Sequence, residues 1–200
     1  GIERAHMTDF QRYETLGLDG SWISLEKGDA KGGCFCTPKG ARVIGWENGV
    51  HYCFIRGYGE TVFAVNPESC TEEYVYPLAA NFRDFLRLLL SCGAAAAIEQ
   101  IVWWTEAQFQ SFLAEDETPP ERTAVLEQIR QAFRLEPMEE PYQYVRALQA
   151  GFDRSKLRYT DEFYQVTGRA RPDGRYAEGP AFEFPPVTFT LPHRDEEAGK

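Results

Sequence analysis

The chain has 200 residues, 43% of them apolar and 14% aromatic, which is enough apolar material for a packed domain and excludes global disorder. Its formal net charge of −10 disfavours direct binding to the phosphates of nucleic acid and favours a basic protein partner. The longest apolar stretch, residues 86–102, is interrupted by Ser91, Gly93, Glu99 and Gln100, so we expect no membrane span.

Two features of the sequence predict a cytoplasmic protein. Residues 1–6 lack the hydrophobic region and cleavage site of a signal peptide, and we interpret them as a cloning remnant ahead of Met7. The five cysteines are odd in number and irregularly spaced, as expected of reduced thiols. Cys34 and Cys36 could ligate a metal or cycle between redox states. Zinc ligands are usually spaced two to four residues apart and number four, so we expect no metal and no cofactor.

Residues 7–93 are predicted to form an α+β region, with a weak helix from Phe10 to Leu18 ahead of the strands. Asn48-Gly49 separates two apolar runs, residues 41–46 and 50–56, and this arrangement is a strong signal for a β-hairpin. A third strand at 61–65 would complete an antiparallel meander. Shorter strands are predicted at 22–25, 33–37 and, before Pro77, 74–76.

From Asn81 the hydrophobic period becomes helical. Asn81 caps a helix with an apolar stripe containing Phe82, Phe85 and Leu86, and Gly93 ends it. The extension at 94–167 contains further predicted helices, which run through the alanines to Trp103, from capping boxes at Thr105 and Thr118, from Pro141 to Gly151, and from Thr160 to Val166. The expected fold is therefore α+β, with a small antiparallel sheet packed on a helix, a C-terminal helical bundle and an extended tail.

Residues 168–200 are predicted to form a charged linker followed by an extended arm. Apolar residues mostly alternate between Phe182 and Leu191, and Pro185-Pro186 restricts such a segment to a sheet edge. The arm either folds back on its own sheet or docks on a second copy of the chain. The second possibility would make this an assembly protein, with homo-oligomers formed through the tail.

No catalytic motif stands out. His51 lies within the hairpin, where a structural or solvated histidine is more common than a catalytic one. The carboxylates Glu60, Glu68, Glu72 and Glu73 could supply an acid–base pair if two of them converged in a cleft, so a small hydrolase or transferase remains an alternative.

The pair Trp103-Trp104 is the most unusual feature of the helical extension. Adjacent helical side chains point about 100° apart, so both rings cannot face the same surface. One is expected in the core, while the other either covers the helices or anchors an interface.

Residues 41–92 resemble the SUKH superfamily (SMI1/KNR4-like proteins). The strands VIGW, YCFI and TVFAV lead into the helix NFRDFLRLLL, and Phe82, Phe85 and Leu86 match the Phe-x-x-Phe-Leu pattern of that family. The Leu-Pro segment usual near the start of the family is missing, and the helices after Gly93 lie outside its pattern.

The resemblance implies a non-enzymatic protein-binding module, such as a bacterial toxin-immunity or regulatory protein. It carries no catalytic residues. Charge complementarity would suit a basic toxin or nuclease as partner. The candidate partner-binding residues are Trp46, Tyr58, Glu60, Glu72, Glu73 and Trp104.

Overall fold

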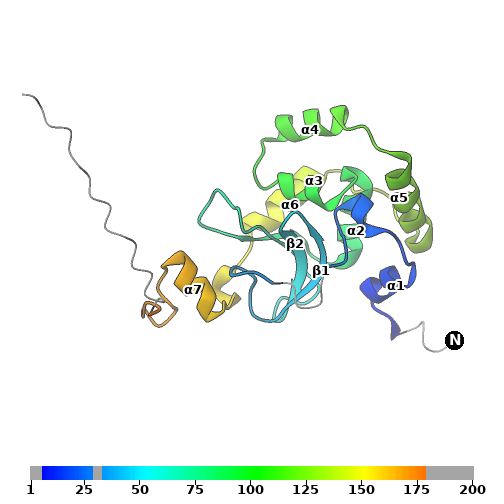
Figure 1. Ribbon diagram of the computed structural model, residues 1–200. Coiled ribbons are helices and arrows are strands. Elements are labelled where there is room, and N and C mark those ends of the chain that lie inside the picture. The colour runs from blue at the N-terminus through cyan, green and yellow to red at the C-terminus, as the bar shows by residue number, and fades with distance from the viewer. Residues whose placement is uncertain (1–5, 29–32, 179–200) are drawn as a thin grey trace, which may run out of the picture.

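A computed structural model describes residues 6–28 and 33–178 (Figure 1). Within them, four antiparallel strands form one sheet in the order β1-β2-β3-β4, accompanied by seven α-helices. The strands are β1 (Ala41–Glu47), β2 (Val50–Ile55), β3 (Val62–Val65) and β4 (Val75–Ala79). The predicted α+β class is confirmed.

The predicted hairpin joins β1 to β2. Asn48 and Gly49 have φ angles of 49° and 86°, and positive values at both central residues match a two-residue turn that follows the twist of the strands. Further along β1 the register shifts between Val43 and Gly45. At Gly45 a Cβ would lie 2.7 Å from the Cα of Leu25, so glycine allows the 20–28 segment to pass close to β1.

Two of the short predicted strands are wrong, and one is longer than expected. Residues 20–23 form the 3-10 helix η2 (Gly20–Ile23), and only Glu26 beyond it bridges to Trp46. Residues 34–37 form a turn in which the Thr37 amide donates to the Cys34 carbonyl over 3.0 Å. β4 continues through Pro77, which an edge strand tolerates because one side of its ladder needs no donor.

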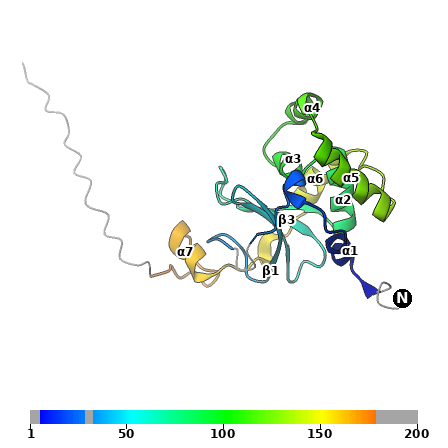
Figure 2. The ribbon, with the colours of Figure 1, turned by 45° about the vertical axis from the view of Figure 1, so that its right-hand side comes forward.

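Side chains alternate across the sheet and build a core on each face. Tyr52 and Ala64 belong to the larger core with the helices that follow β4, whereas Cys53 and Phe63 belong to a second core with α7. The sheet is thus the middle layer, and Figure 2 shows α7 on the side away from α2 and α5.

The helices begin mostly where the sequence predicts. Thr8, Asn81 and Thr105 each accept a hydrogen bond from a backbone amide at a helix start. The predicted capping box at Thr118 is wrong, because Pro119 occupies the N-cap and makes no side-chain bond. The helices are α1 (Asp9–Thr15), α2 (Phe82–Cys92), α3 (Ala95–Gln100), α4 (Glu106–Glu115), α5 (Pro120–Phe133), α6 (Pro141–Ala150) and α7 (Asp161–Thr167), with the 3-10 turn η3 (Arg154–Lys156) before the last.

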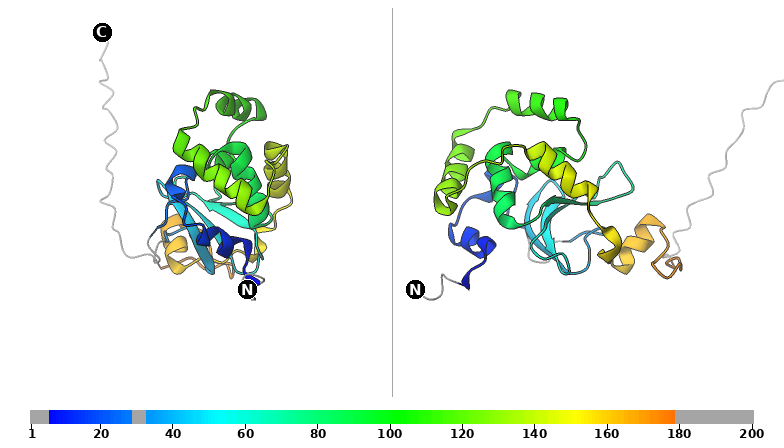
Figure 3. Two further views of the ribbon diagram at one scale, coloured as in Figure 1. Left: turned by 90° about the vertical axis from the view of Figure 1, so that its right-hand side faces the viewer. Right: turned by 180° about the vertical axis from the view of Figure 1, so that it is seen from behind.

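The helical extension adds to both faces of the sheet. On one face α6 packs along β4, and the Tyr144 hydroxyl accepts from the Ala80 amide and donates to Asp84. Figure 3 shows α4 and α5 arching over α2 and α3. After α7 the chain forms a small turn closed by the bridge between Ala170 and Tyr176. The predicted arm at 182–191 and its exchange between protomers lie outside the described residues. No described helix has the length and apolar character needed to span a membrane.

Candidate functional site

A groove runs along the outer edge of β1. It has a volume of about 520 Å³, and six consecutive residues of the strand, 41–46, line one wall. The opposite wall comes from α1 and the 17–28 segment, with the aromatic rings of Phe10 and Tyr13 and the aliphatic side chains of Leu18 and Leu25. The groove thus combines apolar surface with an edge strand.

Residues 6–28 and 33–178 cover the outer edge of β1 only in part. β2 pairs with its inner side, and on its outer side Glu26 exchanges two backbone hydrogen bonds with Trp46, of 3.1 and 2.8 Å. This is the single outer bridge of β1 found among the described residues. An edge strand with unpaired backbone groups is a template for an added strand.

Charged side chains of both signs border this edge. Glu14 lies 3.7 Å from Arg42, whose guanidinium also sits 5.0 Å from the centre of the Phe10 ring. Arg42 is therefore already engaged by an acid and an aromatic ring. Glu26 and Glu47 flank Trp46 at one end of this edge, and Lys27 lines the groove itself.

A second cluster lies on the other face of the sheet and centres on Cys34, Cys36, Thr37 and His51. The Cys34 and Cys36 sulfurs are 3.3 Å apart in the turn at 34–37. The Thr37 Oγ1 lies 3.5 Å from the Cys34 Sγ and 2.8 Å from the His51 Nε2. Cys34 is half-buried, whereas Cys36 and His51 are fully buried.

The hydrogen bonds of His51 define its tautomer. Its Nδ1 lies 3.1 Å from the Gly49 carbonyl oxygen, which can only accept, so Nδ1 carries the hydrogen. The Nε2 therefore accepts from the Thr37 hydroxyl. The Trp46 ring stacks on the imidazole with centroids 4.3 Å apart, and burial lowers the pKa of His51. His51 is thus a neutral, fully oriented acceptor.

The two thiols differ sharply in acidity. Hydrogen bonding from Cys36, with help from Thr37, lowers the pKa of Cys34 to about 5 against the desolvation that opposes it. The same contact with Cys34, together with burial, raises the pKa of Cys36. Cys34 is therefore the nucleophilic member of the pair. No group of three or more metal-ligating side chains is assembled within residues 6–28 and 33–178.

The predicted partner-binding residues fall into separate groups. Trp46 lines the groove, and exposed Glu60 lines a smaller hollow next to it that shares Phe10 and Arg42. Tyr58 packs at 5.2 Å from Phe63 on the other face of the sheet. Only Trp46 and Glu60 thus lie near the edge of β1.

The remaining three candidates lie elsewhere. Glu73 pairs with Arg154 at 3.2 Å, and Glu72 is exposed beside it in the loop between β3 and β4. Trp104 is half-buried against Phe112, with ring centroids 5.1 Å apart. Hence Trp104 lies over the helices of the extension.

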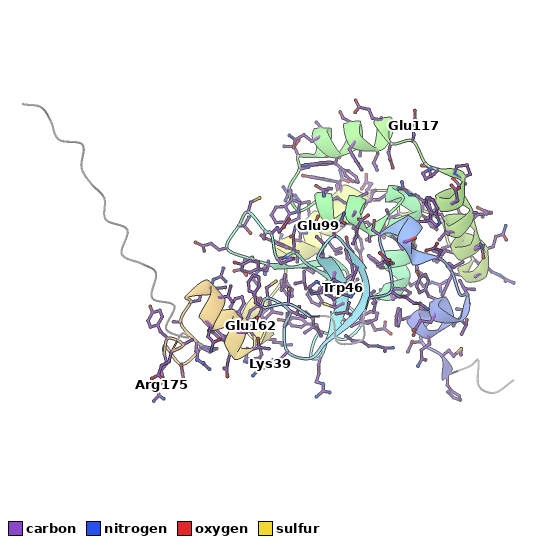
Figure 4. The ribbon with its side chains drawn as sticks, in the orientation of Figure 1. Lys39, Trp46, Glu99, Glu117, Glu162 and Arg175 are labelled. Carbon is purple, nitrogen blue, oxygen red and sulfur yellow. The ribbon has the colours of Figure 1, made fainter. Side chains whose placement is uncertain are left out.

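A carboxylate that sequence reasoning did not identify as a site residue is buried on α3. Glu99 is 3% exposed and accepts from Trp103 Nε1 over 2.7 Å and from Asn66 Nδ2 over 3.0 Å. Burial raises the pKa of this group. Figure 4 places Glu99 at α3 and Trp46 on the sheet. Its position within an alanine-rich apolar stretch was the one signal available in the sequence.

The carboxylates of the hydrolase alternative lie on two loops. Glu60 belongs to the turn after β2, whereas Glu68, Glu72 and Glu73 belong to the loop between β3 and β4. Within that loop Glu68 receives no side-chain ion pair, and the partner of Glu73 is the basic Arg154 among the described residues. This placement does not favour a carboxylate pair.

No known family model matches the chain, and neither does any curated protein or solved structure.

Proposed function

We propose that this protein is a non-enzymatic protein-binding module, which takes up an extended segment of a basic partner along the outer edge of β1. The observation that carries the proposal is the groove lined by six consecutive residues of an edge strand. Because Trp46 is already bridged to Glu26, residues 41–45 of this edge are left to pair with an added strand. An added strand has the same rise as β1, about 3.3 Å per residue, so roughly five of its residues would fit. Backbone hydrogen bonds to β1 would supply affinity, and the aromatic wall would supply side-chain contacts.

Charge favours a basic segment as the occupant. The chain carries a net charge of −10, and Glu26 and Glu47 flank Trp46 next to the groove. The charged residues that line the groove itself are Glu14, Arg42 and Lys27, and Arg42 is already paired with Glu14. A segment bearing lysine or arginine would be steered toward this surface, and raising the salt concentration would slow its association.

The resemblance to the SUKH superfamily supports the same role. The resemblance implies meandering strands that precede a Phe-x-x-Phe-Leu helix, and the chain has β1, β2 and β3 before α2, with the additional strand β4 between them. A toxin-immunity or regulatory function is the specific form that the resemblance suggests. All five cysteines are free, which agrees with a cytoplasmic location.

The test uses capture of partners from the source cell at low and high salt with three forms of the chain. These are the unmodified protein, Glu14→Lys in the groove, and the matched control Glu121→Lys on the exposed start of α5. We expect a specific basic protein that binds the unmodified chain and the control, loses affinity for Glu14→Lys by about tenfold, and dissociates as salt rises.

Hydrogen exchange then locates the contact. Amides of residues 41–46 should gain protection when the captured protein is added. Protection confined to other elements, equal binding by both variants, or no specific partner even at low salt would each contradict the proposal.

A further inference from the structure

We propose that Cys34 and Cys36 form a redox-active thiol pair that exchanges with small disulfides, with Cys34 as the attacking thiol and Cys36 as the resolving thiol. This site lies on the face of the sheet opposite the α1–α6 core and does not depend on the binding role proposed for β1.

The burial of the two sulfurs indicates which one attacks and which one resolves. Cys34 is half-buried, so a small disulfide can reach it, whereas Cys36 is fully buried directly behind it at 3.3 Å. The turn that holds them is closed by the hydrogen bond from the Thr37 amide to the Cys34 carbonyl. Forming the bond requires the sulfurs to approach from 3.3 Å to about 2 Å.

Thr37 and His51 provide a path for the proton of Cys34. The Thr37 hydroxyl has one hydrogen and two possible acceptors, His51 Nε2 at 2.8 Å and the Cys34 sulfur at 3.5 Å. While Cys34 is a thiol, the hydroxyl donates to His51. When the proton of Cys34 passes through Thr37 to His51, the hydroxyl can turn and donate to the new thiolate. Thr37 is therefore a positioning residue between the nucleophile and the base.

The reaction balances as an ordinary thiol–disulfide exchange. The Cys34 thiolate attacks one sulfur of R–S–S–R, which forms Cys34–S–S–R and releases RS⁻, and this leaving thiolate takes up a proton from solvent. Cys36 then loses its proton and attacks the Cys34 sulfur. The Cys34–Cys36 disulfide forms, and the second RS⁻ leaves as RSH with that proton. Two protein thiols are oxidised while one small disulfide is reduced to two thiols.

Among the other titratable groups, Cys53 of β2 belongs to the same core as Cys36, and two further segments contribute tyrosines. Tyr74 precedes β4, and its ring contacts the ring of Phe35. Tyr159 precedes α7, and the charge of Cys36 is one of the influences that raise the pKa of Tyr159, after burial. Glu73, Arg154 and Arg169 in turn surround Tyr159. The Cys34 sulfur itself contacts Cys36 and Thr37, and Thr37 contacts His51, so the exchange rate should report mainly on these four residues.

The test treats the reduced, full-length protein with glutathione disulfide, blocks free thiols with acid-quenched alkylation, and maps the peptides by mass. Exposed Cys70 serves as an internal reference in the same chain. We expect Cys34 to react about tenfold faster than Cys70 despite its lower exposure, and to end in a disulfide with Cys36. In Cys36→Ser, we expect the glutathione to remain attached to Cys34.

Two substitutions at one position test the role of the Thr37 hydroxyl, which also accepts from the Cys34 amide over 2.8 Å. Thr37→Val keeps the shape but removes the hydroxyl, and Thr37→Ser restores it. We expect Thr37→Val to slow the reaction of Cys34 about tenfold and to move its pH profile upward, with Thr37→Ser recovering both. Matched circular dichroism spectra check that each variant is folded.

Three results would overturn the proposal. The first is a Cys34 that reacts no faster than Cys70. The second is a glutathione adduct on Cys34 that persists while Cys36 is present. The third is a rate and pH profile that Thr37→Val leaves unchanged.

Discussion

Replacing Glu99 by alanine and by glutamine separates its hydrogen bonds from its charge. Its Oε1 accepts from both Trp103 and Asn66 and so ties α3 to the loop that follows β3. Glu99→Ala leaves these two donors without their acceptor in a site that is almost closed to solvent. Glu99→Gln keeps an oxygen in place and removes the charge, although its amide then faces the donor Gln100.

The expected magnitudes follow from the contacts. A hydrogen bond to a charged group contributes about 1.5–3 kcal/mol, and relief of the buried charge offsets part of that loss. We therefore expect Glu99→Ala to lower the free energy of unfolding at pH 7 by about 2–4 kcal/mol. Glu99→Gln should stay within about 1 kcal/mol of the unmodified protein.

The pH dependence has a definite sign. Burial raises the pKa of Glu99, so the folded protein holds the proton more tightly than the unfolded chain, in which a glutamate titrates near about 4.3. The contribution of this group to stability is complete below about pH 4.3 and declines as the pH rises through the folded pKa. Glu99→Gln lacks that decline. The free energy of unfolding of Glu99→Gln, relative to that of the unmodified protein, should therefore increase between pH 4.3 and 7.

Urea denaturation monitored by tryptophan fluorescence at several pH values measures both effects. The four tryptophans of the chain include Trp103, which reports directly on the site. Equal loss of stability in the two variants would refute the division into hydrogen bonds and charge. A pH dependence that is the same in Glu99→Gln and in the unmodified protein would refute the buried titration.

Three further predictions concern other parts of the molecule. Because the pKa of Cys34 is about 5, its alkylation rate should be nearly constant from pH 6 to 8. The alkylation rate of an ordinary thiol with a pKa of about 8.5 would rise about 75-fold over the same range. A rise of that size at Cys34 would contradict the lowered pKa. Gly45→Ala pushes against Leu25 and should cost about 1–3 kcal/mol in urea denaturation, while Gly33→Ala, which meets no contact shorter than 3.6 Å, should cost almost nothing. Phe163→Ala opens the second core and should cost about 3–5 kcal/mol, measured in the same way; a smaller loss than that of Gly33→Ala would be inconsistent with burial of this ring.

Local chemistry made much of the fold predictable. Asn48-Gly49 specifies its hairpin because few residue pairs tolerate positive φ at both positions, and Asn81 and Thr105 mark helix starts because their side chains satisfy free amides. The sequence does not predict in the same way which face of the sheet a helix covers. A buried stripe on α7 indicates that the helix packs, but both faces of this sheet are apolar, so the stripe alone does not choose between them.

The candidate site was harder to predict because it is made by contacts between distant segments. Trp46 was identified, and it does line the groove, but the opposite wall comes from α1, about thirty residues earlier. His51 meets Thr37 only because the 34–37 turn folds over β2. The role of Glu99 depends on Asn66, which lies 33 residues away in the sequence. The spacing of residues within a motif does not predict contacts between segments that are distant in the sequence.

The position of α7 late in the sequence also determines when the second face of the sheet can be covered during folding. The meander needs only short loops, so β1 to β4 and α2 can assemble from nearby segments. The second face of the sheet, with Cys53 and Phe63, is covered in part by Cys36, and its cover is complete only when Leu157 and Phe163 arrive about a hundred residues later. During synthesis, therefore, a nascent chain released up to Gly151 would carry a formed sheet with one partly uncovered apolar face. Closure of that face is expected as a separate, slower kinetic step.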